Sequence, residues 1–482
     1  MLQTIPLRRQ RDYRLLWGAR AVTEAGSEVS RLAVPLTAVT LLGASPLQMG
    51  MLTAAASLPF LLVGLPVGVI ADRIARRRPV MVGCEVVAGS AVLTVPVAWV
   101  AGWLTVPWLI AVALIVGTCT VVFRNFNTPH LTSVVPEHQR TAALAGFQSV
   151  FAVAQLGGPG LAGLLVSVLT APLALIVDAI SFLVSAVCLR SIRAPEPTPQ
   201  TLHGQSGRSQ SDPDQSDPDQ SGHKQSGHGQ VQPDRPSGHA TRGRRTLVRE
   251  IRRTLVREIG EGIRTLVGHP VLRALTLAGM TVNLFGAAQL AVYVLFAVNV
   301  LGLPGWLVGI SVVGFGGGGL LGAVVAPRLE RRFGGNRVLL GSVLFFPVGF
   351  VTMAASSGPV WLVSSLIAVS EVVVGAAVVC FSVCSGAATL REAPEAYIGR
   401  VNASINFATQ GVMALGGLLG GVLGEFLGLR PAMWVCAAGA VLTIPCLWWS
   451  PLTKRAHVPH AEAADSPSTA PHPRSTQEAE QR

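Results

Sequence analysis

Long apolar blocks, separated by short polar segments, are the main pattern along the 482-residue chain. Each block is long enough for an α-helix that crosses the hydrocarbon of a membrane, which takes about 20 residues. The pattern predicts an all-α polytopic membrane protein with twelve transmembrane helices, six in each half. The predicted spans cover residues 15–42, 47–71, 79–101, 104–128, 143–169, 171–190, 271–299, 305–327, 337–356, 360–386, 401–427 and 431–450.

Arginine is concentrated in alternate loops between the predicted spans. The arginines of this set are Arg73, Arg76, Arg77, Arg78, Arg140, Arg328, Arg331, Arg332, Arg337, Arg391 and Arg400. The loops of the other set contain no Lys or Arg apart from Arg430 in the last of them. Because cytoplasmic loops carry the excess of positive residues, we expect the Arg-rich loops and both termini to lie in the cytoplasm. The expected location is the bacterial cytoplasmic (inner) membrane.

Two polar regions interrupt this pattern. Residues 191–243 are rich in Gln, Ser, Pro, Gly, Asp and His, a composition typical of a disordered linker. In 244–270 the octapeptide RRTLVREI occurs twice in succession, and its spacing of apolar and basic residues predicts an amphipathic helix on the cytoplasmic membrane surface. The predicted organisation is a first half (1–190), linker, amphipathic helix, second half (271–452) and disordered cytoplasmic tail (453–482).

Composition supports a lipid environment and narrows the functional classes. The chain is 50% hydrophobic and 13% charged, with a mean hydropathy of +0.51. Its net charge of +12 could indicate nucleic-acid binding, but the arginines lie between apolar blocks, where they set membrane orientation. The seven cysteines lie in apolar segments without a metal-binding spacing, and we expect no metal or other cofactor. No HExxH, GxSxG or P-loop occurs, so the sequence does not predict an enzyme.

The two halves share an internal repeat. Corresponding features lie 255 or 258 residues apart: Arg73, Arg76 and Arg77 with Arg328, Arg331 and Arg332; Pro136-Glu137 with Pro394-Glu395; and Gly158, Ala162 and Gly163 with Gly416, Gly420 and Gly421. Three features in the same order at nearly one offset indicate a duplication. The halves are therefore expected to be parallel repeats, related by an axis along the membrane normal.

A loop motif between the second and third spans resembles the GxxxDRxxRR signature of the major facilitator superfamily, whose halves are a known example of parallel repeats. The matching residues are Gly68, Asp72, Arg73, Arg76 and Arg77, and the second copy keeps Arg328, Arg331 and Arg332 without the acid. The resemblance implies that Asp72 bridges the halves near Gly399 and Arg400 and locks a cytoplasmic gate. In the alternative interpretation, Asp72 only sets topology.

Span five contains a second motif, Gly158-Pro159-Gly160-Leu161-Ala162-Gly163, which resembles the GPxxGG sequence of exporters in this superfamily. Nearly the whole chain is similar to the bacterial subgroup that includes the enterobactin exporter and macrolide efflux proteins. RDYRLLWGAR at 11–20, ALIVDAISFLVSA at 174–186 and GRVNASINF at 399–407 support this likeness. An Arg-x-x-x-Gly motif, which many multidrug antiporters carry in span four, is missing, because no glycine lies four residues after Arg124.

Charged and polar residues inside the predicted spans are the candidates for a transport site, because such residues are costly in a membrane. The candidates are Arg20, Glu24, Glu28 and Arg31 on one face of span one, Arg124 in span four, Asn283, Gln289 and Tyr293 in span seven, and Glu371 in span ten. The resemblance implies that these four spans line a central cavity.

We expect one acid, first Glu28 and then Glu371, to bind a coupling proton. In the alternative, Glu24 and Glu28 only neutralise Arg20 and Arg31. Asp178 of span six is expected to make a structural bond to a neighbouring helix.

Together these features predict a secondary active transporter that works by alternating access. The expected function is proton-coupled export of amphipathic small molecules of the drug, macrolide or siderophore type. The expected partners are the substrate, protons and membrane lipid, with no nucleic acid and a monomeric chain. Import of a small solute, or a non-transporting scaffold or receptor, remain alternatives. The sequence does not identify the substrate.

Overall fold

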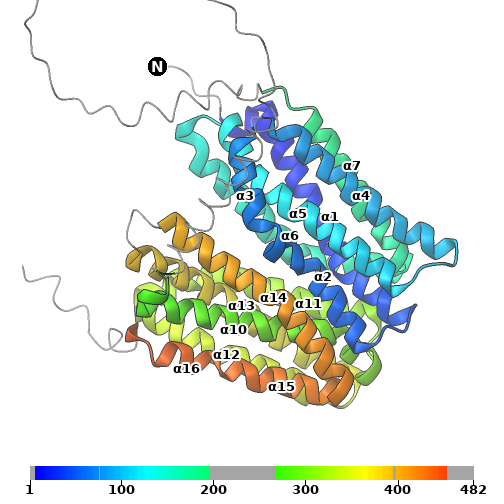
Figure 1. Ribbon diagram of the computed structural model, residues 1–482. Coiled ribbons are helices and arrows are strands. Elements are labelled where there is room, and N and C mark those ends of the chain that lie inside the picture. Colours follow the sequence, from blue (N-terminus) through cyan, green and yellow to red (C-terminus); the bar gives the residue numbers. More distant parts are fainter. Residues whose placement is uncertain (1–5, 75, 195–263, 265, 394–397, 453–482) are drawn as a thin grey trace, which may run out of the picture.

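The computed structural model describes residues 6–74, 76–194, 264, 266–393 and 398–452 (Figure 1). The predicted tail, most of the predicted linker and most of the predicted amphipathic helix lie outside these residues. The helices are α1 (Arg11–Thr40), α2 (Pro46–Leu62), α3 (Gly64–Arg73), α4 (Arg77–Val100), α5 (Val106–Val134), α6 (Arg140–Leu169), α7 (Ala171–Arg190), α10 (Pro270–Leu295), α11 (Gly305–Phe333), α12 (Gly335–Ala355), α13 (Val360–Glu392), α14 (Ile398–Leu427), α15 (Leu429–Val441) and α16 (Thr443–Trp448). The described residues contain no strand.

The predicted all-α polytopic fold is confirmed. Nine helices in the described part of the chain are long and apolar enough to cross a membrane. The apolar helix α2 has 17 residues and continues into α3, and α1 carries several charged residues within an otherwise apolar sequence. Each predicted span overlaps a helix or a pair of consecutive helices.

Two predicted spans are broken, and proline explains both breaks. α2 ends at Leu62, four residues before Pro66, and α15 ends at Val441, four residues before Pro445. A proline has no N–H to donate to the carbonyl four residues earlier, and its ring crowds that carbonyl. Helix α10 ends differently, in a π-helical turn at Phe296–Val300.

The helices form two bundles, one from α1–α7 and one from α10–α16 (Figure 1). In the first bundle α1 packs on α6 and α7, and α4 packs on α5 and α7. In the second, α10 packs on α14 and α15, and α11 packs on α13. The bundles meet where α2 packs on α14 and where α6 packs on α11.

Glycines bring the two bundles into close contact at the Arg-poor ends of these helices. A methyl group added to Gly163 in α6 would lie 3.1 Å from the Cα of Gly309 in α11. A methyl group on Gly421 in α14 would lie 2.8 Å from the Cα of Gly50 in α2. We call these two contacts the glycine seam. Small residues allow helix backbones to approach this closely in membranes, so the seam holds the bundles together at one end.

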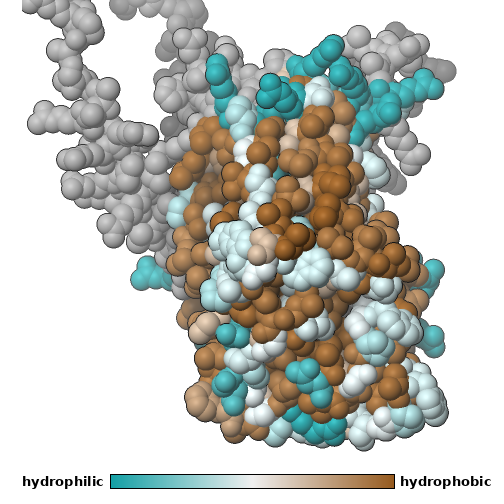
Figure 2. Space-filling model, turned by 90° about the vertical axis from the view of Figure 1, so that its right-hand side faces the viewer, coloured by the Kyte–Doolittle hydropathy of each residue, from teal (hydrophilic) through white to brown (hydrophobic). Residues whose placement is uncertain are grey.

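The outer surface fits a hydrocarbon environment. One face is largely hydrophobic, with hydrophilic residues gathered most densely at its upper end (Figure 2). Large apolar side chains are widely exposed, and Phe426 and Trp449 have 80% and 90% of their surface accessible. In a protein made of apolar helices, exposed apolar surface of this extent indicates contact with a membrane or with a partner.

Candidate functional site

Four charged side chains of α1 form two ion pairs within the first bundle. The guanidinium of Arg20 lies 2.5 Å from the Glu24 carboxylate, and that of Arg31 lies 3.3 Å from the Glu28 carboxylate. Both glutamates are buried. Spacings of three and four residues place neighbouring side chains on the same helix face, which explains both pairs. The structure therefore contains the pairing that sequence analysis offered as an alternative role for these acids.

Glu28 packs directly against the export-like motif of α6. A methyl group added to Gly158 would collide with the Cβ and Cγ of Glu28. The lack of a side chain at Gly158 therefore makes room for the buried glutamate. Gly163, five residues along α6, belongs to the glycine seam. The side chain of Pro159, the third predicted motif residue, lies outside the described part of the chain.

Arg124 extends this charged region to α5. Its guanidinium carbon lies 5.8 Å from the centre of the Phe60 ring in α2, a cation–π contact. It is within electrostatic reach of Glu24, Arg20 and Arg31. We call the five residues Arg20, Glu24, Glu28, Arg31 and Arg124 the charge cluster. It contains three arginines and two glutamates, so its balance is positive when all are ionised.

The candidate residues of the second bundle are more dispersed. The Tyr293 hydroxyl is 2.6 Å from the Ser311 hydroxyl, and the Gln289 amide donates to the Met353 sulfur at 2.8 Å. The Asn283 amide donates to the Gly279 carbonyl of its own helix at 3.0 Å.

Glu371 in α13 is half-buried beside α11, where a methyl group on Gly314 would lie 3.3 Å from its Cβ. It makes no ion pair in the described part of the chain. Tyr293 is its electrostatic neighbour.

The loop motif is described only in part. Gly68 allows α3 to approach α5, because a methyl group there would lie 3.3 Å from the Asn125 side-chain oxygen. The Arg77 guanidinium donates to the Pro129 carbonyl at 2.8 Å. The exposed Arg76 adds no described bond between the bundles. The side chains of Asp72, Arg73, Gly399 and Arg400 lie outside the described part, so the predicted bridge stays a prediction.

The second copy of this motif lies at the end of α11. Arg328 donates to the Val324 carbonyl at 2.8 Å and Arg331 to the Pro327 carbonyl at 3.2 Å, both within their own helix. The guanidinium carbon of Arg332 lies 5.4 Å from the centre of the Phe333 ring. These described contacts keep the second copy on the surface of its own helix.

Two buried acids lie outside the charge cluster. Asp178 in α7 accepts hydrogen bonds from Ser30 in α1 and, at 3.1 Å, from Ser181. Glu85 in α4 accepts one from Thr23 in α1 at 3.0 Å. Sequence analysis missed Glu85, although a single carboxyl group in an apolar block was a usable signal.

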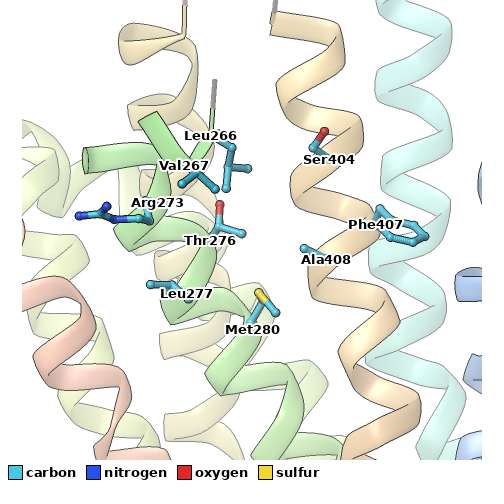
Figure 3. Close-up of a pocket in the computed structure, with 9 residues that line it drawn as sticks. All are labelled: Leu266, Val267, Arg273, Thr276, Leu277, Met280, Ser404, Phe407 and Ala408. Atoms are coloured by element: carbon cyan, nitrogen blue, oxygen red, sulfur yellow. The ribbon is translucent and has the colours of Figure 1, made fainter. Parts of the chain in front are cut away.

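A largely apolar cavity of about 370 Å³ opens between α10 and α14 (Figure 3). Its lining residues are Leu266, Val267, Arg273, Thr276, Leu277, Met280, Ser404, Phe407 and Ala408. Thr276 and Met280 lie on the side of α10 that faces α14, and Arg273 points away from it (Figure 3). A cavity with these walls suits an apolar group more than a charged one.

Two bundles of apolar helices, a repeated sequence pattern and charges buried inside the spans define a polytopic membrane transporter. The comparisons agree. The chain belongs to the Major Facilitator Superfamily, whose sequence profile matches residues 16–416 and, in a second match, residues 321–478.

The chain is also similar to individual proteins. It is 26% identical over 188 residues to macrolide efflux protein A of Streptococcus pyogenes, a match that covers 38% of this chain and 44% of the relative. It is 24% identical over 192 residues to the uncharacterized MFS-type transporter YkuC of Bacillus subtilis, covering 40% and 44%. The matches thus span less than half the length of these curated relatives.

Solved structures share the fold. The nucleoside transporter NupG gives a TM-score of 0.63 at 13% identity, covering 93% of this chain and 100% of that one. An inward-facing bacterial homologue of the iron transporter ferroportin gives 0.61 at 15% identity, covering 94% and 100%. At this identity the likeness shows the architecture and says nothing about the substrate.

Proposed function

We propose that this protein is a proton-coupled exporter of amphipathic small molecules in the bacterial cytoplasmic membrane. The observation that carries the proposal is the contact between Glu28 and Gly158. It joins a buried, paired carboxylate to the export-like motif of α6. Because α6 also reaches the second bundle through Gly163, a change at Glu28 acts on a helix that holds the two halves together.

The place where the bundles are joined supports the proposed alternating access. The glycine seam closes the Arg-poor ends, and we infer that the Arg-rich ends face the cytoplasm. The arrangement then corresponds to an inward-facing state, in which a substrate reaches the protein from the cytoplasm. Outward opening requires the seam to separate and the Arg-rich ends to close. Asp72 is the residue proposed to hold that closed cytoplasmic end.

Protonation of Glu28 would supply the driving step. The proton neutralises the carboxylate, weakens its ion pair with Arg31 and leaves the charge cluster more positive. The added positive charge repels a cationic amphipathic substrate more strongly, so proton binding and substrate binding oppose each other. Glu371 is the second candidate for this proton.

The substrate class rests on two supports. The cavity between α10 and α14 suits an apolar group of a ligand, and the similar protein of Streptococcus pyogenes is named for macrolide efflux. Macrolides combine a large apolar ring with polar groups, and many carry an amine. They are therefore the first compounds to test.

Drug susceptibility in an efflux-deficient bacterium tests the proposal. The chain, Glu28→Gln, Glu371→Gln and Asp72→Asn would be expressed at matched membrane levels and challenged with a macrolide. Glu137→Gln is a matched control, because Glu137 lies outside the spans and its side chain is 90% exposed. We expect the chain and the control to protect the cells, and Glu28→Gln and Asp72→Asn to fail. Full protection by both Glu28→Gln and Glu371→Gln would contradict the assignment of these two acids as proton-binding residues.

A further inference from the structure

A polar seam runs through the interior of the first bundle, where α1 and α4 both pack on α7. On α1 it contains Thr23 and Ser30, two helical turns apart, on a different face from Glu24 and Glu28. On α7 it contains Asp178, Ser181 and Ser185, and on α4 it contains Glu85. We call these six residues the inner polar seam.

Glu85 occupies one end of this seam. It is 3% exposed and accepts its described hydrogen bond from the Thr23 hydroxyl. Ser185, which is fully buried, faces the same carboxyl group. Its hydroxyl makes no hydrogen bond of standard geometry within the described part of the chain. The Ser185 hydroxyl is therefore available to form a hydrogen bond with the Glu85 carboxyl group.

Asp178 occupies the other end of the seam and is also fully buried. Hydroxyl groups of Ser30 and Ser181 donate to it. The helices are so close here that a methyl group on Gly26 of α1 would collide with Ser181 and lie 2.7 Å from an Asp178 oxygen. Asp178 thus ties α1 to α7, as Thr23 ties α1 to Glu85.

The charged and titratable groups that face this seam do not neutralise it. Arg20 is within electrostatic reach of Glu85 but is paired with Glu24 at 2.5 Å. Asp178 is within electrostatic reach of Glu85, and the thiols of Cys84 and Cys119 lie beside the same part of α4 and α5. Neither Glu85 nor Asp178 has a cation within ion-pair distance in the described part of the chain. This contrasts with Glu24 and Glu28, each of which has an arginine.

A carboxylate that is buried without a cation costs several kcal/mol, whereas a neutral carboxylic acid with hydroxyl partners costs far less. The two acids also repel each other when both are ionised. We propose that Glu85 and Asp178 hold an exchangeable proton inside the first bundle, away from the charge cluster. This inference rests on the proposed proton-coupled transport. It adds a second proton-binding site that does not compete with substrate.

Loss of the proton would act on α1. An ionised pair in the inner polar seam is unstable, and it gains water only if α1 separates from α4 and α7. The same helix carries Glu28 and Arg31 on its other face. Protonation of the seam therefore positions the charge cluster, and the seam acids are positioning residues for the transport step.

Infrared spectroscopy of the purified protein at neutral pH tests the inference without a substrate. Protonated carboxyl groups have a carbonyl stretch separate from that of carboxylates, and the band shifts in heavy water. We expect the band in the wild type, with a loss of intensity in Glu85→Gln and in Asp178→Asn. Glu137→Gln is the matched control and keeps the full band. An unchanged band in both Glu85→Gln and Asp178→Asn overturns the inference.

A milder variant covers the case in which Asp178→Asn does not fold. Ser181→Ala keeps the carboxyl group but removes one hydroxyl donor, so it should move the frequency of the band without abolishing it. A frequency identical to that of the wild type counts against the inference.

Transport in vesicles separates this inference from the proposed function. With a labelled macrolide as probe, Glu85→Gln should keep exchange across the membrane at equal pH and lose accumulation driven by a pH gradient. Gradient-driven accumulation equal to that of the wild type overturns the inference. If the wild type moves no macrolide, the proposed function fails. The infrared result still shows whether Glu85 and Asp178 hold a proton.

Discussion

The two bundles have the same architecture but very different interiors. The first contains the charge cluster and two further buried acids, on α1, α4, α5 and α7. Among the described helices of the second bundle, Glu371 is the one charged residue far from the ends of its helix. α11 and α13 instead pack through glycines, since methyl groups on Gly314 and Gly322 would each lie 2.7 Å from a carbonyl oxygen of α13.

This difference separates what the duplication preserved from what it did not. Gly163 and Gly421 correspond in the repeat, and both belong to the glycine seam. Glu28 has no counterpart with a paired arginine in the second half. The glycine seam is therefore formed by corresponding positions of both halves, whereas the proposed proton-binding residue Glu28 lies in the first half.

The largest effects on transport are expected from changes in the glycine seam. Gly163→Val and Gly421→Val should each prevent close packing of the Arg-poor ends, because the added side chain meets a backbone at about 3 Å. Overpacking of about 1–3 kcal/mol shifts a conformational equilibrium by about 5- to 150-fold. Macrolide protection should fall by a similar factor in both variants. Gly157→Val is the control, because no atom lies within 4 Å of its added methyl group. Unequal effects of the two seam variants would break the symmetry.

The asymmetric chemistry predicts a difference between the two acids. Glu28→Gln removes the paired carboxylate proposed to carry the proton and should abolish gradient-driven accumulation, a fall of at least about tenfold. Glu371→Gln, which breaks no described ion pair, should have a smaller effect. Transport rates at matched protein levels measure both. A larger effect at Glu371 would move the proton site to the second half.

The close packing of α1 on α7 predicts a stability effect in the first bundle. Gly26→Ala forces a methyl group against Ser181 and Asp178 and should cost about 1–3 kcal/mol. Gly83→Ala on α4 has no atom within 4 Å of its added methyl group and should stabilise its helix by up to about 1 kcal/mol. Thermal unfolding in detergent compares them. A Gly26→Ala protein as stable as the control would contradict the packing.

The smallest effect is expected inside the second bundle. Tyr293→Phe removes the hydroxyl that bonds with Ser311 and should lower stability by about 0.5–1.5 kcal/mol. Transport should be unchanged, because Tyr293 and Ser311 are both buried within one half. A loss of transport at normal stability would give Tyr293 a functional role.

The helices were predictable from sequence because apolar length alone marks a span. The broken spans were not predicted, although Pro66 and Pro445 carried the signal. The four-residue spacing on α1 predicted which charges share a face. It could not show that the Glu28 side chain packs against Gly158. Contacts between helices depend on tertiary packing, which the local sequence pattern does not reveal. Glu85 was missed although its carboxyl group stands alone in an apolar block, and its hydrogen-bond partner Thr23 on α1 is revealed only by the structure.

Proton-coupled export is tested most directly by macrolide uptake into inverted membrane vesicles, with proton release measured at the same time. The wild type is expected to accumulate the macrolide when the vesicle interior is acidic and to release protons as it does so. Glu28→Gln should do neither, while Glu137→Gln should match the wild type. Equal accumulation with and without the pH gradient, or full accumulation by Glu28→Gln, would contradict proton-coupled export through the first bundle.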